Sequence, residues 1–170
     1  MEPEPVLPVD DARTPMPGGP LQRLRCGELE VALAPEAGGR IAQLKYLGVD
    51  WLVGPEDGWP ATIAWGCYPM VPWAGRIRCG RFNFDGKAYS LPINFEEHAI
   101  HGVGFSRPWR IERLEPDAAT LSLALPEDRY WPFGGIAAQM IELTPDSLRL
   151  RLDVQAGAHA MPVVLGWHPW

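Results

Sequence analysis

Short segments that alternate apolar and polar residues, joined by turn residues, recur along the chain and constrain its fold more than any other feature. The sharpest case is Asp85-Gly86, which separates residues 81–84 from residues 87–91 and predicts a two-residue β-hairpin. No convincing stretch places apolar residues at i, i+3, i+4 and i+7 over three turns. The other predicted strands are residues 29–34, 41–46, 49–53, 109–114, 120–125, 136–143 and 148–154. These patterns predict an all-β chain, with an antiparallel sandwich or barrel as its architecture.

Composition excludes several classes of function. The chain has 170 residues and a net charge of −6, without a block of Lys or Arg, so we expect no nucleic-acid partner. Its apolar runs are far shorter than a membrane span, and we expect no membrane partner. The three cysteines, Cys26, Cys67 and Cys79, form no CxxC pair and predict neither a disulfide framework nor a zinc knuckle. Reduced thiols favour a cytoplasmic location.

The length fits one domain with a real hydrophobic core. Residues 1–20 are rich in proline and poor in aliphatic pattern, so we predict a disordered tail there. A proline-rich partner motif is the alternative for this segment. The domain is then expected over residues 21–170.

The stretch from Trp65 to Arg81 is unusual because it places aromatic and arginine side chains between prolines and glycines. This composition disfavours a helix and predicts an irregular loop. Aromatic faces and guanidinium groups suit a neutral, hydroxyl-rich ligand, which makes Trp65, Trp73 and Arg76 candidate substrate-binding residues. The alternative is a rigid surface loop whose tryptophans cap the core.

Histidines supply the candidate acid–base groups, because they titrate near neutral pH. His98 and His101 lie close together in the sequence, His168 follows an apolar segment, and His159 lies in a polar turn. Three histidines and a nearby glutamate resemble the ligands of a cupin metal site. Residues three apart on a strand point to opposite faces, however, so we predict no metal unless a tight turn intervenes.

Several motifs together resemble the aldose 1-epimerase (galactose mutarotase) family. They are residues 39–41, 72–78 leading into 80–82, the Asp85-Gly86 hairpin, residues 91–94, 98–102, Trp109, and 161–162 through 168–170. The resemblance covers nearly all of residues 21–170, and the order and spacing of the motifs make it specific. It implies a large antiparallel β-sandwich and no cofactor.

The same resemblance implies the roles of three residues. Arg76 matches an arginine that binds sugar hydroxyls, although Gly75 replaces the asparagine that usually precedes it. His101 matches a histidine that contacts the sugar near the ring oxygen and the anomeric centre. His168 matches the general acid that protonates the ring oxygen, with Trp170 where the family usually has Tyr or Phe. His168 and His101 are therefore the predicted catalytic residues.

One expected group is missing from the chain. Family members are about twice as long, and their catalytic glutamate and a sugar-binding aspartate lie in the C-terminal part. Glu96, Glu97 and Asp153 are carboxylates without a context that marks any of them as the base. We therefore expect the chain to correspond to the N-terminal half of the domain.

Three functions follow as hypotheses. The first is an aldose 1-epimerase that interconverts the α and β anomers of a monosaccharide by acid–base ring opening. The second is a carbohydrate-binding module that has kept the site and lost the chemistry. The third is a sugar-phosphate epimerase, in which arginines would bind the phosphate; the candidates are Arg40, Arg76, Arg78 and Arg81.

Overall fold

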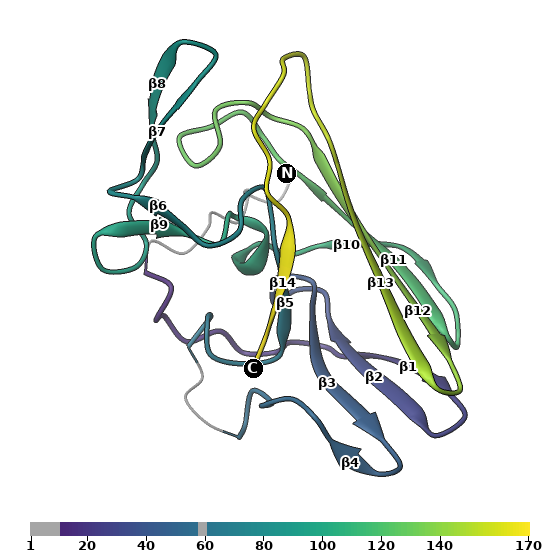
Figure 1. The fold of residues 1–170 in the computed structure, drawn as a ribbon. Helices are drawn as coiled ribbons and strands as arrows, with labels where there is room; N and C mark the ends of the chain where they lie inside the picture. Colours follow the sequence, from purple (N-terminus) through teal and green to yellow (C-terminus); the bar gives the residue numbers. More distant parts are fainter. Residues whose placement is uncertain (1–10, 58–60) are drawn as a thin grey trace, which may run out of the picture.

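The computed structural model describes residues 11–57 and 61–170, and its main body is two antiparallel sheets packed face to face (Figure 1). The first sheet has the order β1-β2-β3-β5-β14, with β4 paired to β3. Its strands are β1 (Gln22–Cys26), β2 (Leu29–Ala34), β3 (Arg40–Tyr46), β4 (Val49–Asp50), β5 (Cys67–Met70) and β14 (Gly166–Pro169). The second sheet has the order β10-β11-β12-β13. Its strands are β10 (Arg110–Leu114), β11 (Ala118–Ala124), β12 (Ile136–Thr144) and β13 (Ser147–Gln155). The predicted antiparallel sandwich is confirmed.

Smaller elements complete the described fold. Strand β6 (Arg76–Arg78) pairs with β9 (His98–Ile100), and β7 (Arg81–Phe84) pairs with β8 (Lys87–Ser90). Asp85 and Gly86, between β7 and β8, have φ values of 48° and 72°, so the predicted two-residue hairpin turn is confirmed. The only described helix is the three-residue 3₁₀ helix η1 (Gly104–Ser106), and no helix in residues 11–57 or 61–170 is long and apolar enough to cross a membrane.

The main core lies between the two sheets and follows from the alternation of side chains along each strand. Strands β1 and β2 contribute Leu24, Val31 and Leu33, while Leu121 and Ile141 come from β11 and β12; all belong to one buried cluster. The neighbouring residues on these strands point to the outer faces. The outer face of the first sheet at β3, β5 and β14 carries the side chains discussed below.

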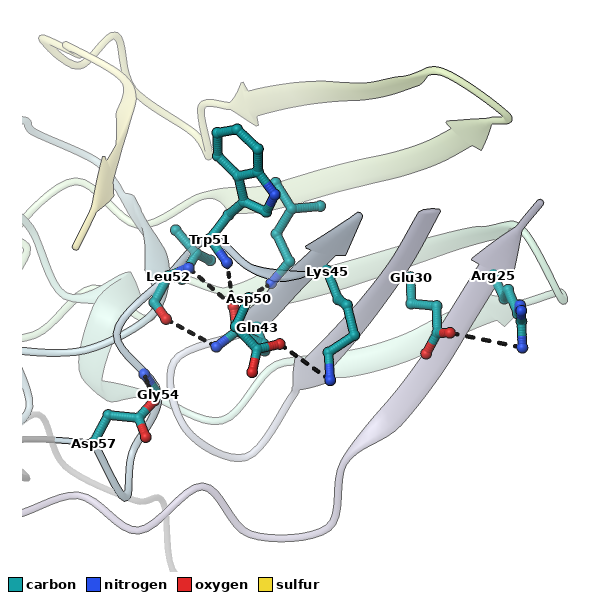
Figure 2. A network of polar contacts seen from close by, with 10 residues as sticks. Arg25, Glu30, Gln43, Lys45, Asp50, Trp51, Leu52, Gly54 and Asp57 are labelled. Carbon is teal, nitrogen blue, oxygen red and sulfur yellow. Dashed lines mark hydrogen bonds and ion pairs between the residues drawn. The ribbon is translucent and has the colours of Figure 1, made fainter. Parts of the chain in front are cut away.

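Strand β4 ends at Asp50, although the sequence predicts a strand over residues 49–53. The side chain of Gln43 explains the early end, as Figure 2 shows. Its Oε1 accepts hydrogen bonds from the N–H groups of Trp51 (3.2 Å) and Leu52 (2.9 Å), and its Nε2 donates to the Leu52 carbonyl (2.8 Å). The N–H of Trp51 also donates to the Leu44 carbonyl of β3 at 2.9 Å, so the side chain of Gln43 takes the place of strand pairing at Leu52.

The N-terminal segment differs from the prediction. Residues 1–10 of the predicted tail lie outside the described residues. Residues 11–20 are packed against the domain: Ala12 is fully buried, and its N–H donates to the Asn94 carbonyl at 2.7 Å. The Thr14 carbonyl accepts from the N–H of Thr62 at 2.8 Å. The prediction of disorder is therefore wrong for residues 11–20, because their order comes from long-range backbone bonds that composition does not reveal.

Candidate functional site

The candidate site lies on the outer face of the β5–β14 pair. His168 of β14 is directly opposite Tyr68 of β5 in the antiparallel register. Cys67 and Trp167, their neighbours in sequence, pack with the core between the sheets. Alternation therefore places Tyr68 and His168 together on the other face. Their rings are stacked, with centroids 5.1 Å apart and planes at 13°.

A tight turn after β9 brings His101 to the same place. His101 has a φ of 59° and Gly102 a φ of 77°, so the backbone turns sharply at both residues. The N–H of His101 donates to the Gly75 carbonyl at 2.9 Å, and Gly102 lies against the Val71 carbonyl. Because of this turn, the direction of the His101 side chain does not follow the alternation of strand β9. His98 contacts Cys79 and Glu97 instead.

The two histidines meet above an aromatic floor. The rings of His101 and His168 are T-shaped, with centroids 5.1 Å apart. Tyr68 lies 6.0 Å from His101, and Phe105 packs against both Tyr68 (5.6 Å) and His101 (6.3 Å). Trp170, which is 45% exposed, stacks on His168 at 5.5 Å and is the exposed aromatic ring at this site.

Arg76 lies at the rim of this group. Its side chain is exposed, and the guanidinium carbon is 5.9 Å from the Phe95 ring centroid. Strand β6 places Arg76 opposite Ile100, the residue before His101. The structure therefore places Arg76 close enough to His101 to affect its pKa, and His101 in contact with His168; their roles in a site stay predictions.

Burial sets the protonation of both histidines. Burial is the largest cause of the lowering of the His101 pKa to about 4, and the nearby His168 and the Arg76 cation contribute to the same shift. Burial also lowers the pKa of His168. Both imidazoles are thus neutral at pH 7, and a neutral imidazole has one donor and one acceptor nitrogen. The Nδ1 atoms of both rings are buried without a hydrogen-bond partner among the described residues. Such a pair can exchange protons with oxygen atoms of a ligand.

The predicted aromatic wall is wrong for two residues. Trp65 is fully buried and lies under the guanidinium of Arg40 at 4.2 Å. Trp73 is 7% exposed and packs against Trp131 in the core between the sheets. Neither ring can present a face to a ligand, so both follow the alternative of tryptophans that support the core. Residues 65–81 also contain the short strands β5 and β6 and are not one irregular loop.

The aromatic residues that do meet the histidines are Tyr68, Phe105 and Trp170, none of which the sequence marks as a site residue. Their contacts depend on the pairing of β14 with β5, between segments about a hundred positions apart in the chain. Two backbone bonds hold the end of β14: Trp170 donates to the Gly66 carbonyl, and Val53 donates to the Trp170 carbonyl, each at 3.0 Å. The Gln43 network in Figure 2 fixes the segment that contains Val53.

Metal-binding side chains do not gather at this site. No group of three or more His, Cys, Asp or Glu residues within 11–57 and 61–170 is arranged to hold a metal ion. Glu96 and Glu97, the carboxylates nearest to His101 in sequence, are exposed, and Glu97 approaches His98. The titratable side chains that contact each other at this site are His101 and His168.

The lowered pKa of His101 predicts how stability depends on pH. The unfolded chain takes up a proton near pH 6.5, whereas the folded chain takes it up only near pH 4. Stability from this group is therefore present above pH 6.5 and is lost as the pH falls toward 4. We expect the urea midpoint to fall between pH 7 and pH 5. The slope should be shallower in His101→Asn and unchanged in His159→Asn, an exposed loop position. Equal slopes in all three proteins would contradict this assignment.

The chain resembles known proteins in sequence and in fold. The profile of a family described as aldose 1-epimerase matches residues 20–170. YphB of Escherichia coli K12, described as uncharacterized, is 34% identical over 107 residues, which are 61% of this chain and 36% of YphB. YihR of the same organism, also uncharacterized, is 31% identical over 140 residues, 78% of this chain and 44% of YihR.

Solved structures share the fold. A candidate aldose 1-epimerase from Escherichia coli K12 superposes with a TM-score of 0.78 at 27% identity, over 88% of this chain and 51% of that protein. The chain thus spans less than half the length of the curated relatives that it matches and about half of this solved structure.

Proposed function

The chain belongs to the aldose 1-epimerase family, and from this premise we propose that its site takes part in mutarotation, the interconversion of the α and β anomers of a hexose. The observation that supports this most directly is the contact between two neutral histidine rings on one face, beside an exposed arginine. The family indicates an isomerase acting on sugars. The particular reaction and the roles below are our proposal.

Mutarotation requires proton transfer at two oxygens of one sugar ring. An acid gives a proton to the ring oxygen while a base removes the proton of the anomeric hydroxyl, and the ring opens to the aldehyde. Rotation about the C1–C2 bond presents the other face of the aldehyde. Ring closure then reverses both proton transfers. Groups that titrate near the working pH do this best, and each contributes typically about 10²–10⁴-fold.

We assign the acid role to His168 and a ring-oxygen contact to His101. The acid is the protonated form of His168, which is the minor form at pH 7 because burial lowers the pKa of this residue. The lowered pKa makes that form a stronger acid, and the neutral form recovers the proton on ring closure. His101, neutral at pH 7, can hydrogen-bond the sugar without adding a second positive charge beside His168. Arg76 would donate to sugar hydroxyls from the rim, and Trp170 would cover an apolar face of the ring.

The base is the part that this assignment leaves open. Glu96 and Glu97 are exposed, and Asp153 lies on β13 in an ion pair with Arg151. None of the three contacts His101 or His168 in the structure. The chain is therefore proposed to carry the acid side of the site.

Two other functions use the same residues. A carbohydrate-binding module would need only the contacts of Arg76 and Trp170. A sugar-phosphate epimerase would need cations at the rim, and Arg76 and Arg78 are both exposed on β6. Arg40 does not belong to such a phosphate site, because it is fully buried and all of its donors are used within the protein.

Binding can be tested without turnover. Titrating the full chain with glucose or galactose should shift the imidazole NMR signals of His101 and His168 and leave those of His159 unchanged. Arg76→Ala should weaken this response, whereas Arg78→Ala, the same charge change two residues along β6, should preserve it. Equal responses in both variants would remove Arg76 from the proposed site. No response to either sugar in the unmodified chain would contradict the proposal itself.

The cellular setting is also proposed. Cys26, Cys67 and Cys79 are all free in the structure, and burial raises the pKa of the Cys67 thiol to about 11, which makes it unreactive. Free thiols are typical of a reducing compartment, so we propose a cytoplasmic protein with a monosaccharide as its partner.

A further inference from the structure

Arg40 is a buried charged residue that lies in one row with the candidate site. Strand β5 runs between β3 and β14, and the pairing of Ile41 with Cys67 places Arg40 opposite Tyr68. Tyr68 in turn lies opposite His168. The guanidinium carbon of Arg40 is 5.0 Å from the Tyr68 ring centroid, and the His168 centroid is 5.1 Å from it on the side of the neighbouring strand. A cation, a phenol ring and an imidazole therefore follow one another across three adjacent strands.

All five N–H groups of Arg40 have acceptors. Nε donates to the Ala37 carbonyl at 2.6 Å, Nη1 to the carbonyls of Thr62 (2.8 Å) and Trp65 (3.0 Å), and Nη2 to the Phe105 carbonyl (2.8 Å). The fifth bond reaches the Met16 sulfur at 3.5 Å. The planar fork of arginine can make this set of bonds, whereas lysine has only three donors.

These bonds connect separate segments to the floor of the site. The 61–66 segment leads directly into β5, which contains Tyr68, and the Ile63 carbonyl accepts a hydrogen bond from the Tyr68 hydroxyl at 3.3 Å. Phe105, whose carbonyl is bound to Arg40, packs its ring against both Tyr68 and His101. Tyr68 and Phe105, two of the three aromatic residues that contact the histidines, are therefore both in contact with Arg40 on the side away from those rings.

Arg40 is unusual because it buries a positive charge without a carboxylate partner among the described residues. Its side chain is fully buried, and no carboxylate is bonded to it. Taking an unpaired charge out of water is costly, and the ring faces of Trp65 and Tyr68 and the carbonyl dipoles offset that cost only in part. Burial accordingly lowers the pKa of Arg40 to about 9. Buried charges of this kind gather at functional sites more often than elsewhere.

We propose that Arg40 is a positioning residue for the two histidines. It fixes Tyr68 and Phe105 in the orientation that holds the imidazoles of His168 and His101 against each other. The inference rests on the proposed function in one respect, since it assigns a purpose to the histidine pair. Its structural content, the dependence of the histidine rings on Arg40, can be measured without a sugar.

The test compares Arg40→Lys with Arg107→Lys in the full chain. Arg107 is also buried, but its hydrogen bond and ion pair, at 2.9 Å, go to Asp128 and not to Tyr68 or the histidines. The ring of His168 stacks on both Tyr68 and Trp170. The ring currents of these two residues shift the ring-proton NMR signals of His168 away from their positions in the unfolded chain. In Arg40→Lys we expect the His168 and His101 signals to move at least halfway back toward those positions. In Arg107→Lys they should stay in place.

A second variant covers loss of folding. If circular dichroism shows Arg40→Lys to be unfolded, Arg40→Gln takes its place, because a neutral amide avoids the buried charge and still lacks the five donors of the guanidinium. It should produce the same histidine shifts. Unmoved histidine signals in a folded Arg40→Lys or Arg40→Gln protein, or equal shifts in Arg107→Lys, would overturn the inference. A failure of the unmodified chain to respond to sugar would instead count against the proposed function alone.

Discussion

Replacing Gly102 with alanine is expected to destabilise the domain by about 4 kcal/mol, near the upper limit for single substitutions. A Cβ on Gly102 would lie 2.0 Å from the Val71 carbonyl oxygen, so one of two backbone segments must move. The φ of 77° adds the strain of a side chain in the left-handed region, about 1–2 kcal/mol. Because Gly102 follows His101 directly, the shift should also displace that imidazole. Urea unfolding measures the loss.

Gly48→Ala is the matched control for this substitution. Gly48 has the same φ of 77°, but nothing lies within 4 Å of the Cβ that alanine would add. We expect a loss of only about 1–2 kcal/mol there, from backbone strain alone. The difference between the two variants isolates the close approach of Gly102 to Val71. Similar losses in both variants would show that the turn after β9 can relax and does not depend on glycine for space.

The 170-residue chain by itself is expected to bind sugar only weakly and not to accelerate mutarotation appreciably. Acid and base act together on two oxygens of one ring, and no described carboxylate contacts His101 or His168. Loss of one partner typically removes about 10²–10⁴-fold, or about 3–5 kcal/mol of barrier stabilisation. Polarimetry on freshly dissolved α-glucose or α-galactose measures the rate directly, with the uncatalysed solution as the baseline.

His168→Ala provides the control for this measurement. If the unmodified chain gives no gain over the baseline, the control should give the same rate. A clear gain that disappears in His168→Ala would show that a carboxylate within this chain acts as the base. That result would contradict the assignment of only the acid side of the site to these residues, while it would support His168 as the acid.

Local sequence patterns determined the class of fold. The Asp85-Gly86 turn needs two residues with positive φ, a requirement that Asp-Gly meets without help from distant parts of the chain. Strand β13 alternates leucines with charged residues, and its half-buried leucine face and exposed arginines follow that alternation. Such features depend on residues a few positions apart, so they can be predicted from the chain itself.

The site could be predicted only in part. Arg76, His101 and His168 were predicted because the stretches around them resemble motifs of the aldose 1-epimerase family, and their roles stay predictions. Trp65 looked equally suitable by type, but burial beneath Arg40 decides its role, and burial is a property of the assembled sheet. A tryptophan at a surface and one in a core have the same local sequence signal.

The remaining features belong to the tertiary structure alone. The stacking of Tyr68 on His168 requires β14 to pair with β5, and the row from Arg40 through Tyr68 requires β5 to lie between β3 and β14. The sequence by itself determined the all-β class and the Asp85-Gly86 hairpin, since those follow from local backbone preference and from the alternation of side chains. The acid–base residues that it indicated stay predictions. Only the tertiary structure decided which rings meet and which charges are buried, because contacts between distant strands set both.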